Sequence, residues 1–464
     1  MLDKAIIQQL QQIVGADYLT TEPADLTCYA FDATQRRYLP DVVIYPHNAA
    51  EIAEILKLAN AHRIPVVPRG SGSGFSGGSL PIEGGIELVL RRMDRILEID
   101  EDNMIAVVEP GVVTETFQKA VEAHGLFYPP DPASLKFSSM GGNVAECAGG
   151  PRCVKYGVTR DYILGLEVVT PTGDIINTGG RTMKGVVGYD LTRLFVGSEG
   201  TLGVVTQIIV KLIPKPAAVK TMLITFDSIR GASQAVSHIV LGRIIPTTLE
   251  FMDSTSLDVV RKATDIVIPE QVKAVLVVEV DGEPELLEKQ AQRILDIVKP
   301  FGVVDTRIAK NKAESDDIWK LRRSISPSLR TVNPNKFNED ICVPRSRIPD
   351  MIVALEKISS EVGVPIINFG HAGDGNIHVN VMVDLSTPGM DEKVERALRA
   401  IFEATLQLGG TISGEHGIGI TKAPYLRMEL KDKVIEYMRI IKRALDPNNI
   451  LNPGKIFGTD GGQQ

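Results

Sequence analysis

Four loop-like segments rich in glycine, serine or proline lie between residues 68 and 206, and they constrain the fold more than any other feature. They are PRGSGSGFSGGS at 68–79, PPDPAS at 129–134, SSMGGNVAECAGG at 138–150 and FVGSEGTLGVVT at 195–206. Glycine permits conformations and close backbone approaches that other residues do not. Four such loops in one module of the chain indicate a site for a large, flat ligand with polar ends.

The first loop contains a literal G-x-G-x-x-G at Gly72, Gly74 and Gly77, directly after the strand-like IPVV. A dinucleotide fingerprint of the Rossmann type needs a helix that begins at the last glycine. Here turn-like SLPIEGG and strand-like IELVL follow instead, which disfavours an NAD site. Small residues with many free N–H groups suit a diphosphate, although a flexible surface loop is the alternative. The candidate ligand-binding residues of this loop are Arg69, Gly70, Ser71, Gly72, Ser73, Gly74 and Ser76.

Length and charge exclude several classes of protein. The 464 residues are enough for two or three domains, and 50 basic against 58 acidic residues disfavour a nucleic-acid binder. Four cysteines without a C-x-x-C pair indicate reduced thiols. The first 15 residues have the spacing of an amphipathic helix rather than of a signal peptide, and no apolar run is long enough to span a membrane. We expect a cytoplasmic protein, or one bound peripherally at the inner face of the membrane.

The chain changes its pattern at KLIPKP, which ends at residue 216. Strands separated by glycine-rich loops precede this point, and strands alternating with amphipathic helices follow it. We expect an N-terminal helical segment at 1–36, a ligand-binding domain at 37–216 and a second domain at 217–445. The predicted fold class is α+β, and the second domain is expected to be an antiparallel sheet covered by helices. Residues 446–464 carry Asn, Pro and Gly rather than a regular element.

Three of the seven histidines fall between residues 371 and 416. A strand over NIHVNV places Asn376, His378 and Asn380 on one face, and His371 is expected in the glycine-containing loop before it. Two imidazoles with the carboxylate of Glu415 suit a divalent ion such as Zn²⁺, Mn²⁺ or Fe²⁺. Histidines that only form hydrogen bonds within a core are the alternative.

Two further segments carry basic groups suited to a substrate carboxylate. WKLRRSIS at 319–326 is expected to begin a helix that bears Arg322 and Arg323, and Lys336 is expected just before a strand at 339–344. Arginine binds carboxylates through two nitrogens at once. An arginine pair on a solvated helix face is the competing interpretation.

The ordered motifs PRGSGSGFSGGS, PPDPAS, SSMGGNVAECAGG, YGVTRDYILGLEVVTPTG and FVGSEGTLGVVTQ resemble the FAD-binding domain of the vanillyl-alcohol oxidase (PCMH-type) flavoproteins. The C-terminal half resembles the FAD-linked oxidase cap domain of the D-2-hydroxyacid dehydrogenases. That group includes D-lactate dehydrogenase, D-2-hydroxyglutarate dehydrogenase and the FAD subunit of bacterial glycolate oxidase. The resemblance implies an FAD domain of two α/β subdomains, with residues 446–464 returning to it.

The resemblance also assigns roles to residues. FGHAGDGNIH and SGEHG match the family motifs that carry the metal ligands, here His371, His378 and Glu415, and the catalytic base, here His416. Arg322 and Lys336 match the positions that hold the substrate carboxylate. Many relatives bind the flavin covalently through a histidine in the first loop, but this chain has none between His62 and His124, so non-covalent FAD is implied. Further FAD-binding positions implied are Asp131, Ser134, Gly141, Gly142, Asn143, Gly149, Gly157, Gly200, Val204 and Asn452.

The implied activity is oxidation of a small D-2-hydroxy acid, D-lactate or glycolate, to the 2-oxo acid. Since the chain has no iron–sulfur motif, the electrons are expected to pass to an iron–sulfur subunit, an electron-transferring flavoprotein or a quinone. Two alternatives stay open: a non-catalytic flavin-binding subunit of a glycolate-oxidase-like complex, and a D-2-hydroxyglutarate-type dehydrogenase. Ether-lipid synthases and sugar oxidases share the scaffold, but they do not need the paired histidine motifs.

Overall fold

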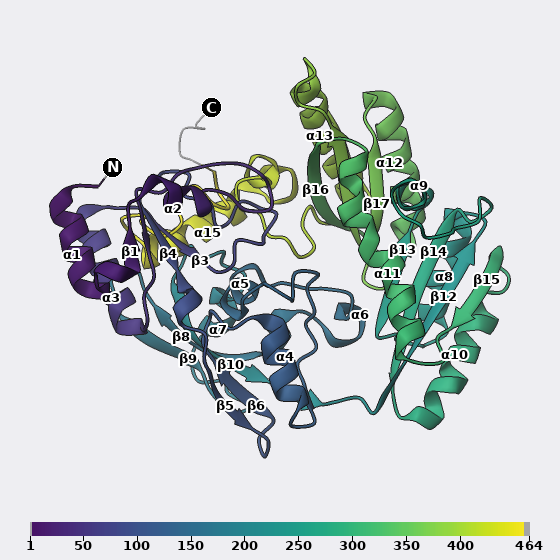
Figure 1. Cartoon of the computed structure of the whole chain (residues 1–464), viewed down its shortest axis with the longest axis horizontal. Helices are drawn as coiled ribbons and strands as arrows, with labels where there is room; N and C mark the ends of the chain where they lie inside the picture. The colour runs from purple at the N-terminus through teal and green to yellow at the C-terminus, as the bar shows by residue number, and fades with distance from the viewer. Residues whose placement is uncertain (1, 459–464) are drawn as a thin grey trace. The chain divides into compact units, whose positions relative to one another are not determined.

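A computed structural model describes residues 2–458 of the chain (Figure 1). The chain forms two compact units. The first unit comprises Met1–Gly149, Val158–Lys215 and Glu415–Gln464, and the second comprises Gly150–Gly157 and Pro216–Gly414.

The first sheet of the first unit is built on three parallel strands. Its order is β1 (Leu19–Thr20), β2 (Val42–Ile44), β4 (Ile86–Val89) and β3 (Val66–Arg69), and only the β1–β2 pair is antiparallel. The helices α1 (Lys4–Val14) and α3 (Ala49–His62) pack their apolar residues against it in one core cluster. Asn48 caps α3 by accepting a hydrogen bond from the Glu51 N–H, which fixes where this helix begins.

The second sheet of the first unit is antiparallel throughout. Its order is β5 (Ile96–Asp100), β6 (Ile105–Val108), β10 (Val204–Lys211), β8 (Ile163–Val169) and β9 (Ile175–Gly179). A separate two-stranded pair joins β7 (Leu126–Phe127) to β11 (Ile213–Pro214). The helices of this unit not yet named are α2 (Pro23–Cys28), α4 (Thr114–Glu122), α5 (Met140–Glu146), α7 (Leu191–Phe195), α14 (Leu426–Glu429) and α15 (Asp432–Leu445).

The second unit is a seven-stranded antiparallel sheet with helices packed on it. The strand order is β15 (Val303–Ile308), β12 (Ala218–Phe226), β14 (Ala274–Gly282), β13 (Thr248–Met252), β17 (Ile366–His371), β18 (Asn376–Val383) and β16 (Asn335–Cys342). Apolar residues of α9 (Ser254–Ala263) and α11 (Lys312–Ser328) form a core cluster with one face of this sheet. The other helices of the unit are α6 (Cys153–Tyr156), α8 (Ile229–Leu241), α10 (Pro284–Val298), α12 (Ile348–Val362) and α13 (Met390–Gln407).

The predicted α+β class, with an FAD-type domain and an antiparallel sheet covered by helices, is confirmed. As expected, a strand rather than a helix follows the first glycine loop. The third glycine-rich segment is not a simple loop, because Ser139 caps the short helix α5 within it.

The compact units differ from the predicted domain boundaries in two stretches. Residues 150–157, expected in the domain at 37–216, group with the second unit. Residues 415–445, expected in the second domain, group with the first unit. The physical reason is visible at α15, whose buried Lys442 donates hydrogen bonds to the carbonyls of Thr201 and Leu451, both 2.8 Å away. Of the segment expected at 446–464, residues 459–464 lie outside the described part of the chain.

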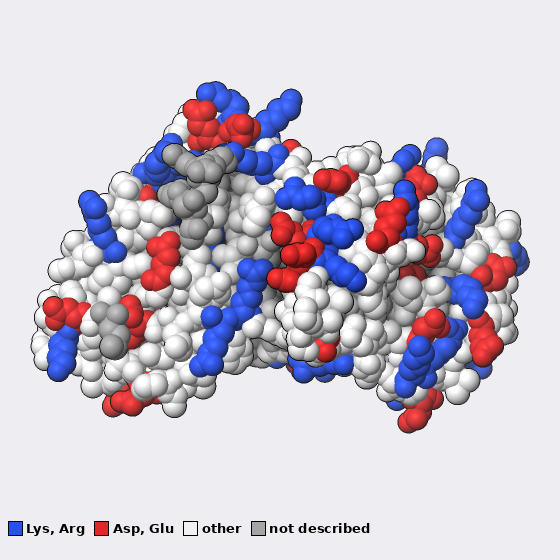
Figure 2. Space-filling model, turned by 90° about the horizontal axis from the view of Figure 1, so that it is seen from above, with Lys and Arg blue, Asp and Glu red and all other residues white. Residues whose placement is uncertain are grey.

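On the face shown in Figure 2, basic and acidic side chains are interspersed rather than gathered by sign. None of the helices among the described residues is both long and apolar enough to cross a membrane.

Candidate active site

The hairpin β17–β18 brings two predicted metal ligands together. His371 and His378 are 5% and 8% exposed, and their Nε2 atoms lie 3.3 Å apart. His378 is on the polar face of β18, as the alternation of NIHVNV predicts. His371 was expected in a loop, but it is the last residue of β17, opposite Asn376 in the register. The strand extends to His371 because the ladder with β18 continues up to the turn.

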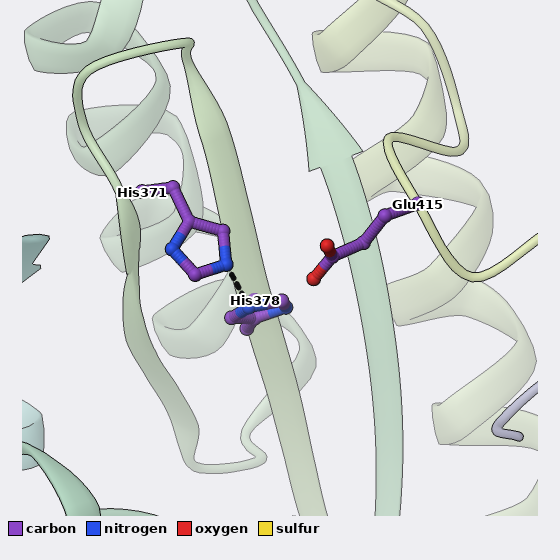
Figure 3. Close-up of side chains that lie close together, drawn as sticks. All are labelled: His371, His378 and Glu415. Atoms are coloured by element: carbon purple, nitrogen blue, oxygen red, sulfur yellow. Dashed lines mark hydrogen bonds between the residues drawn. The ribbon is translucent and has the colours of Figure 1, made fainter. Parts of the chain in front are cut away.

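Glu415 completes the group. It follows Gly414, whose N–H donates to both the backbone carbonyl and the carboxylate of Asp340 at 2.9 and 2.8 Å. A Cβ at position 414 would lie 2.2 Å from the amide nitrogen of Asn376, so a larger residue here would displace the buried Asn376 side chain. One ligand atom each of His371, His378 and Glu415 lies within 4.8 Å of the others (Figure 3). Two imidazoles and a carboxylate at this spacing fit a divalent cation.

Glu250 on β13 was not predicted from the sequence, and it links this group to α11. Its carboxylate is fully buried and accepts a hydrogen bond from Nδ1 of His371 and one from Nε of Arg322 at 2.9 Å. Burial alone would raise the pKa of Glu250, but the charges of His371 and Arg322 hold it below its ordinary value. Glu250 is the one charged residue in β13 (TLEFM), but nothing local in the sequence connects it to His371 or Arg322.

The two predicted carboxylate-binding residues lie on the same face of the sheet as the histidines. Lys336 of β16 lies opposite Met382 of β18. Met382 is four positions after His378 on the same strand, so Lys336 shares the sheet face of His378. Arg322 reaches this face from α11 and stacks over the ring of Phe369 at 4.6 Å. Burial, followed by the charge of Arg330, lowers the pKa of Lys336.

The local structure around both residues differs from the prediction. Arg322 is in the middle of α11 rather than at a helix start, and Lys336 is within β16 rather than before a strand. The reason is that α11 begins at its cap Asn311, and β16 pairs with β18 over its whole length. Arg323 is exposed, which fits the solvated helix face that was the competing interpretation.

The first glycine loop follows β3 and is shaped by Arg69. The guanidinium of Arg69 donates to the carbonyls of Tyr29, Phe31 and Ser79 and pairs with buried Glu87. Arg69 was predicted among the residues that bind the ligand. It instead lies 5% exposed behind the loop and holds its two ends together.

The segment that follows Glu415 packs on this loop. The ring of His416 stacks on Phe75 with centroids 5.2 Å apart, and the N–H of Ile420 donates to the carbonyl of Ser76 at 2.8 Å. Glu199, a second residue that the sequence did not reveal, accepts from the N–H groups of Ile418 and Gly419, both at 2.7 Å. The predicted base is therefore beside the predicted cofactor loop.

The loop has the features of a ligand cradle. Ser71 is exposed and Ser73 is half-buried, and a side chain on Gly74 would meet no described atom within 4 Å. Among the described residues, the buried hydroxyl of Ser76 has no hydrogen-bond partner. On Gly70, by contrast, a Cβ would lie 2.4 Å from the Ser139 hydroxyl, so the loop runs against the segment that begins α5. These residues fit the diphosphate of a dinucleotide.

The remaining cofactor-binding candidates divide into two kinds. Some are held by the protein itself: Asn143 donates to the Thr114 hydroxyl at 2.7 Å, and Val204 is buried in β10. A side chain on Gly141 or Gly200 would meet Pro110 or Pro68. The others lie in or beside the glycine-rich segments of the first unit, except Gly157, which belongs to the second unit; they are Asp131, Ser134, Gly142, Gly149 and Gly157.

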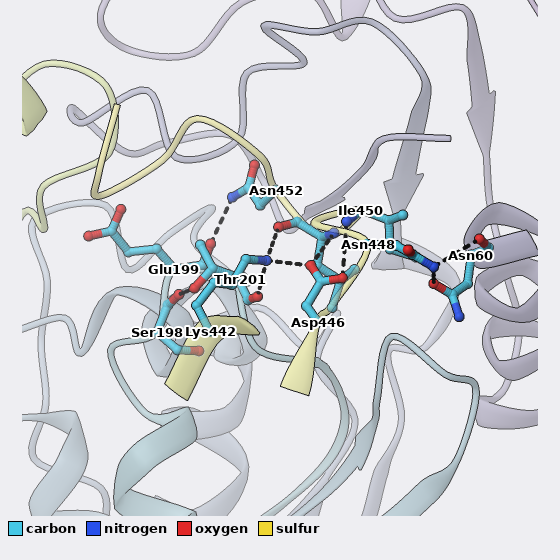
Figure 4. Close-up of polar contacts among 10 residues, drawn as sticks. Asn60, Ser198, Glu199, Thr201, Lys442, Asp446, Asn448, Ile450 and Asn452 are labelled. Atoms are coloured by element: carbon cyan, nitrogen blue, oxygen red, sulfur yellow. Dashed lines mark hydrogen bonds and ion pairs between the residues drawn. The ribbon is translucent and has the colours of Figure 1, made fainter. Parts of the chain in front are cut away.

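Asn452 ties the C-terminal segment to the loops. Its amide donates to the carbonyls of Gly78 and Glu199, both at 2.7 Å, while Lys442 and Asp446 bind the backbone of the preceding residue, Leu451 (Figure 4). Asn452 therefore connects the first glycine-rich segment, at 68–79, to the fourth, at 195–206.

Comparison with known proteins identifies the family. Residues 215–456 match the family described as FAD linked oxidases, C-terminal domain, and residues 40–179 match the FAD binding domain. The chain belongs to the FAD-linked oxidases. This FAD-linked oxidase is thus an oxidoreductase with an FAD-binding domain, as the motifs predicted.

Individual relatives span the whole chain. The Bacillus subtilis protein named glycolate oxidase subunit GlcD is 48% identical over 461 residues, which cover 99% of this chain and 98% of that protein. D-lactate dehydrogenase of Archaeoglobus fulgidus is 37% identical over 94% of this chain and 96% of its own. Among solved structures, p-cresol methylhydroxylase aligns with a TM-score of 0.83 at 18% identity, covering 99% of this chain and 98% of its own, which shows a shared fold.

Proposed function

We propose that this FAD-linked oxidase oxidises a small D-2-hydroxy acid, glycolate or D-lactate, to the 2-oxo acid with the help of a divalent metal. The observation that carries the proposal is the group of His371, His378 and Glu415. Its two histidines lie on the sheet face that carries Lys336 and that Arg322 reaches from α11. A cation beside two fixed positive side chains suits a ligand that offers both a hydroxyl and a carboxylate. Relatives are named for glycolate and D-lactate.

In this proposal the residues of the chain bind, orient and deprotonate the substrate. Arg322 and Lys336 hold the carboxylate, and the metal ligands bring the hydroxyl oxygen to a fixed point. Glu250 accepts a hydrogen bond only from Nε of Arg322. Within the described residues, the terminal nitrogens Nη1 and Nη2 have no protein partner, so they can donate to the substrate carboxylate. His416 takes the hydroxyl proton, since imidazole titrates near neutral pH. A bound metal would supply Lewis-acid polarisation of the hydroxyl, and bound FAD would supply the two-electron oxidant.

FAD is proposed to be non-covalent, held by the loops of the first unit. The absence of a histidine from the first glycine loop supports this. The electrons then pass to an iron–sulfur subunit, an electron-transferring flavoprotein or a quinone, either in the cytoplasm or at the inner face of the membrane. The word subunit in the name of the Bacillus subtilis relative supports a protein partner.

Anaerobic mixing of the FAD-loaded protein with D-lactate, L-lactate, glycolate and D-2-hydroxyglutarate tests the proposal. We expect D-lactate or glycolate to bleach the flavin absorbance, whereas L-lactate does not. Bleaching by D-2-hydroxyglutarate alone would replace the substrate with the larger acid. If dithionite bleaches the flavin but none of the acids does, the chain is not a hydroxy-acid dehydrogenase by itself, which favours the non-catalytic subunit.

A further inference from the structure

Glu250 is a fully buried charged group next to the candidate metal ligand His371. It lies on β13 directly opposite His371 of β17 in the antiparallel register, and its side chain is 0% exposed. Cross-strand neighbours of this kind have their side chains on the same face of the sheet. The position of the Glu250 carboxylate beside the His371 ring is therefore set by strand pairing.

The two carboxylate oxygens have different partners. Oε1 accepts from Nδ1 of His371, and Oε2 accepts from Nε of Arg322 at 2.9 Å. An ionised carboxylate can only accept hydrogen bonds, so both partners must donate to it. Glu250 thus bonds to a residue proposed to bind the metal and to one proposed to bind the substrate carboxylate.

The bond to His371 has a consequence for the ring. If Nδ1 carries the hydrogen, Nε2 keeps its lone pair, and Nε2 is the atom that lies 3.3 Å from Nε2 of His378. A carboxylate that receives the second N–H of a metal-binding histidine fixes its tautomer and orientation. The bond to Arg322 acts in the same way, because it holds Nε while the stacking on Phe369 holds the plane of the guanidinium.

We infer that Glu250 is a positioning residue that sets the metal ligand His371 and the substrate-binding Arg322 at the same time. The inference rests on the proposed function. It predicts that metal affinity and substrate affinity both depend on one carboxylate that contacts neither ligand.

Glu250→Gln tests this inference. The amide keeps the size of the side chain but has one acceptor oxygen facing two donors, so either His371 or Arg322 loses its bond. The matched control is Glu279→Gln on the adjacent strand β14, because Glu279 is also a buried carboxylate (9% exposed) and accepts from Trp319 of α11 at 2.7 Å. Its hydrogen-bond partners are Thr221 and Trp319 rather than a histidine, and its conversion to Gln disturbs the same helix.

Zn²⁺ affinity is measured by calorimetry on chelator-stripped, FAD-loaded protein, and KM and kcat are measured with the substrate that bleaches the flavin. For Glu250→Gln we expect Zn²⁺ to bind about 10- to 100-fold more weakly or KM to rise about tenfold, with FAD content unchanged. Glu279→Gln should shift neither quantity. The inference is wrong if Glu250→Gln has the Zn²⁺ affinity and the KM of the wild type. It is also wrong if Glu279→Gln shifts these quantities as much as Glu250→Gln does.

Failure of the inference and failure of the proposed function are distinguishable. If the wild type itself neither binds Zn²⁺ nor bleaches with any hydroxy acid, the proposed function is wrong. If the wild type does both and Glu250→Gln matches it, only the role of Glu250 is wrong. Should Glu250→Gln not fold, Glu250→Asp carries the test, because its shorter carboxylate cannot reach both partners; wild-type affinities in that variant contradict the inference.

Discussion

The two units of the chain build their polar sites differently: the first relies on backbone groups and the second on side chains. In the first unit, backbone groups dominate: the carbonyls of Gly78 and Glu199 and the N–H groups of Ile418 and Gly419 make the contacts around the glycine loop. In the second unit, side chains from separate strands and a helix meet on one sheet face, as His371, Glu250 and Arg322 show. A site of the first kind should be sensitive to added side chains, and one of the second kind to lost functional groups.

The largest effect is expected at His416, the proposed base beside the cofactor loop. His416→Ala should retain FAD but lower kcat about 10²- to 10⁴-fold, because a positioned general base contributes that much. Turnover and flavin content of the purified variant are measured together. His62→Ala, at the exposed end of α3, is the control and should behave as the wild type. A His416→Ala variant with full activity would remove the residue from the mechanism.

Lys442→Met should cause the next largest change, in stability rather than in activity. Lys442 donates to two backbone carbonyls and pairs with Asp446, which is 1% exposed. Its loss leaves a buried carboxylate without its cation, at a cost of about 3–5 kcal/mol. We expect the temperature of flavin release to fall by about 10 °C.

The matched control is Lys433→Met on the same helix. Lys433 pairs with Glu436 at 2.8 Å, but its side chain is 73% exposed. Exposed pairs of this kind contribute at most about 1 kcal/mol, so the release temperature should change by only a few degrees. Equal effects of the two variants would show that Lys442 does not anchor the C-terminal segment.

Lys336→Met should act on substrate binding. Loss of a charged hydrogen bond of about 1.5–3 kcal/mol lowers kcat/KM about 10- to 150-fold, mainly through KM. The exposed Lys320→Met on α11 should have no effect. Because burial and then Arg330 lower the pKa of Lys336, its charge is present at low pH and is lost as the pH rises, before an ordinary lysine would lose its proton. KM of the wild type should therefore increase with pH in that range, while Lys336→Met stays flat.

Gly141→Ala should give the smallest change, and it tests whether added side chains disturb the first unit. A Cβ on Gly141 would lie 2.5 Å from Cβ of Pro110, which is part of a rigid ring. We expect a loss of about 1–3 kcal/mol from overpacking, although alanine favours a helix over glycine. A side chain on Gly180 would meet no described atom within 4 Å, so Gly180→Ala is the control. Equal temperatures of flavin release for the two variants would contradict the close approach of Gly141 to Pro110.

The sequence predicted what depends on local residue type. The glycine loops, the strand at NIHVNV and the α+β class follow from spacing and periodicity, and the histidine motifs are short enough to be recognised in one segment. Glu250 and Glu199 could not be found in this way, because each acts across more than 100 positions of the chain. Arg69 was misplaced for a related reason: two of its carbonyl partners, Tyr29 and Phe31, lie 40 and 38 positions before it, outside the glycine loop.

The comparison leads to one direct measurement, the rate of flavin bleaching by the preferred D-2-hydroxy acid before and after metal removal. If the first unit holds FAD and the histidine group holds the metal, a chelator should leave the flavin bound and reducible by dithionite. It should abolish bleaching by the acid, and added Zn²⁺ or Mn²⁺ should restore it. Unchanged bleaching in metal-free protein would contradict the metal-assisted account.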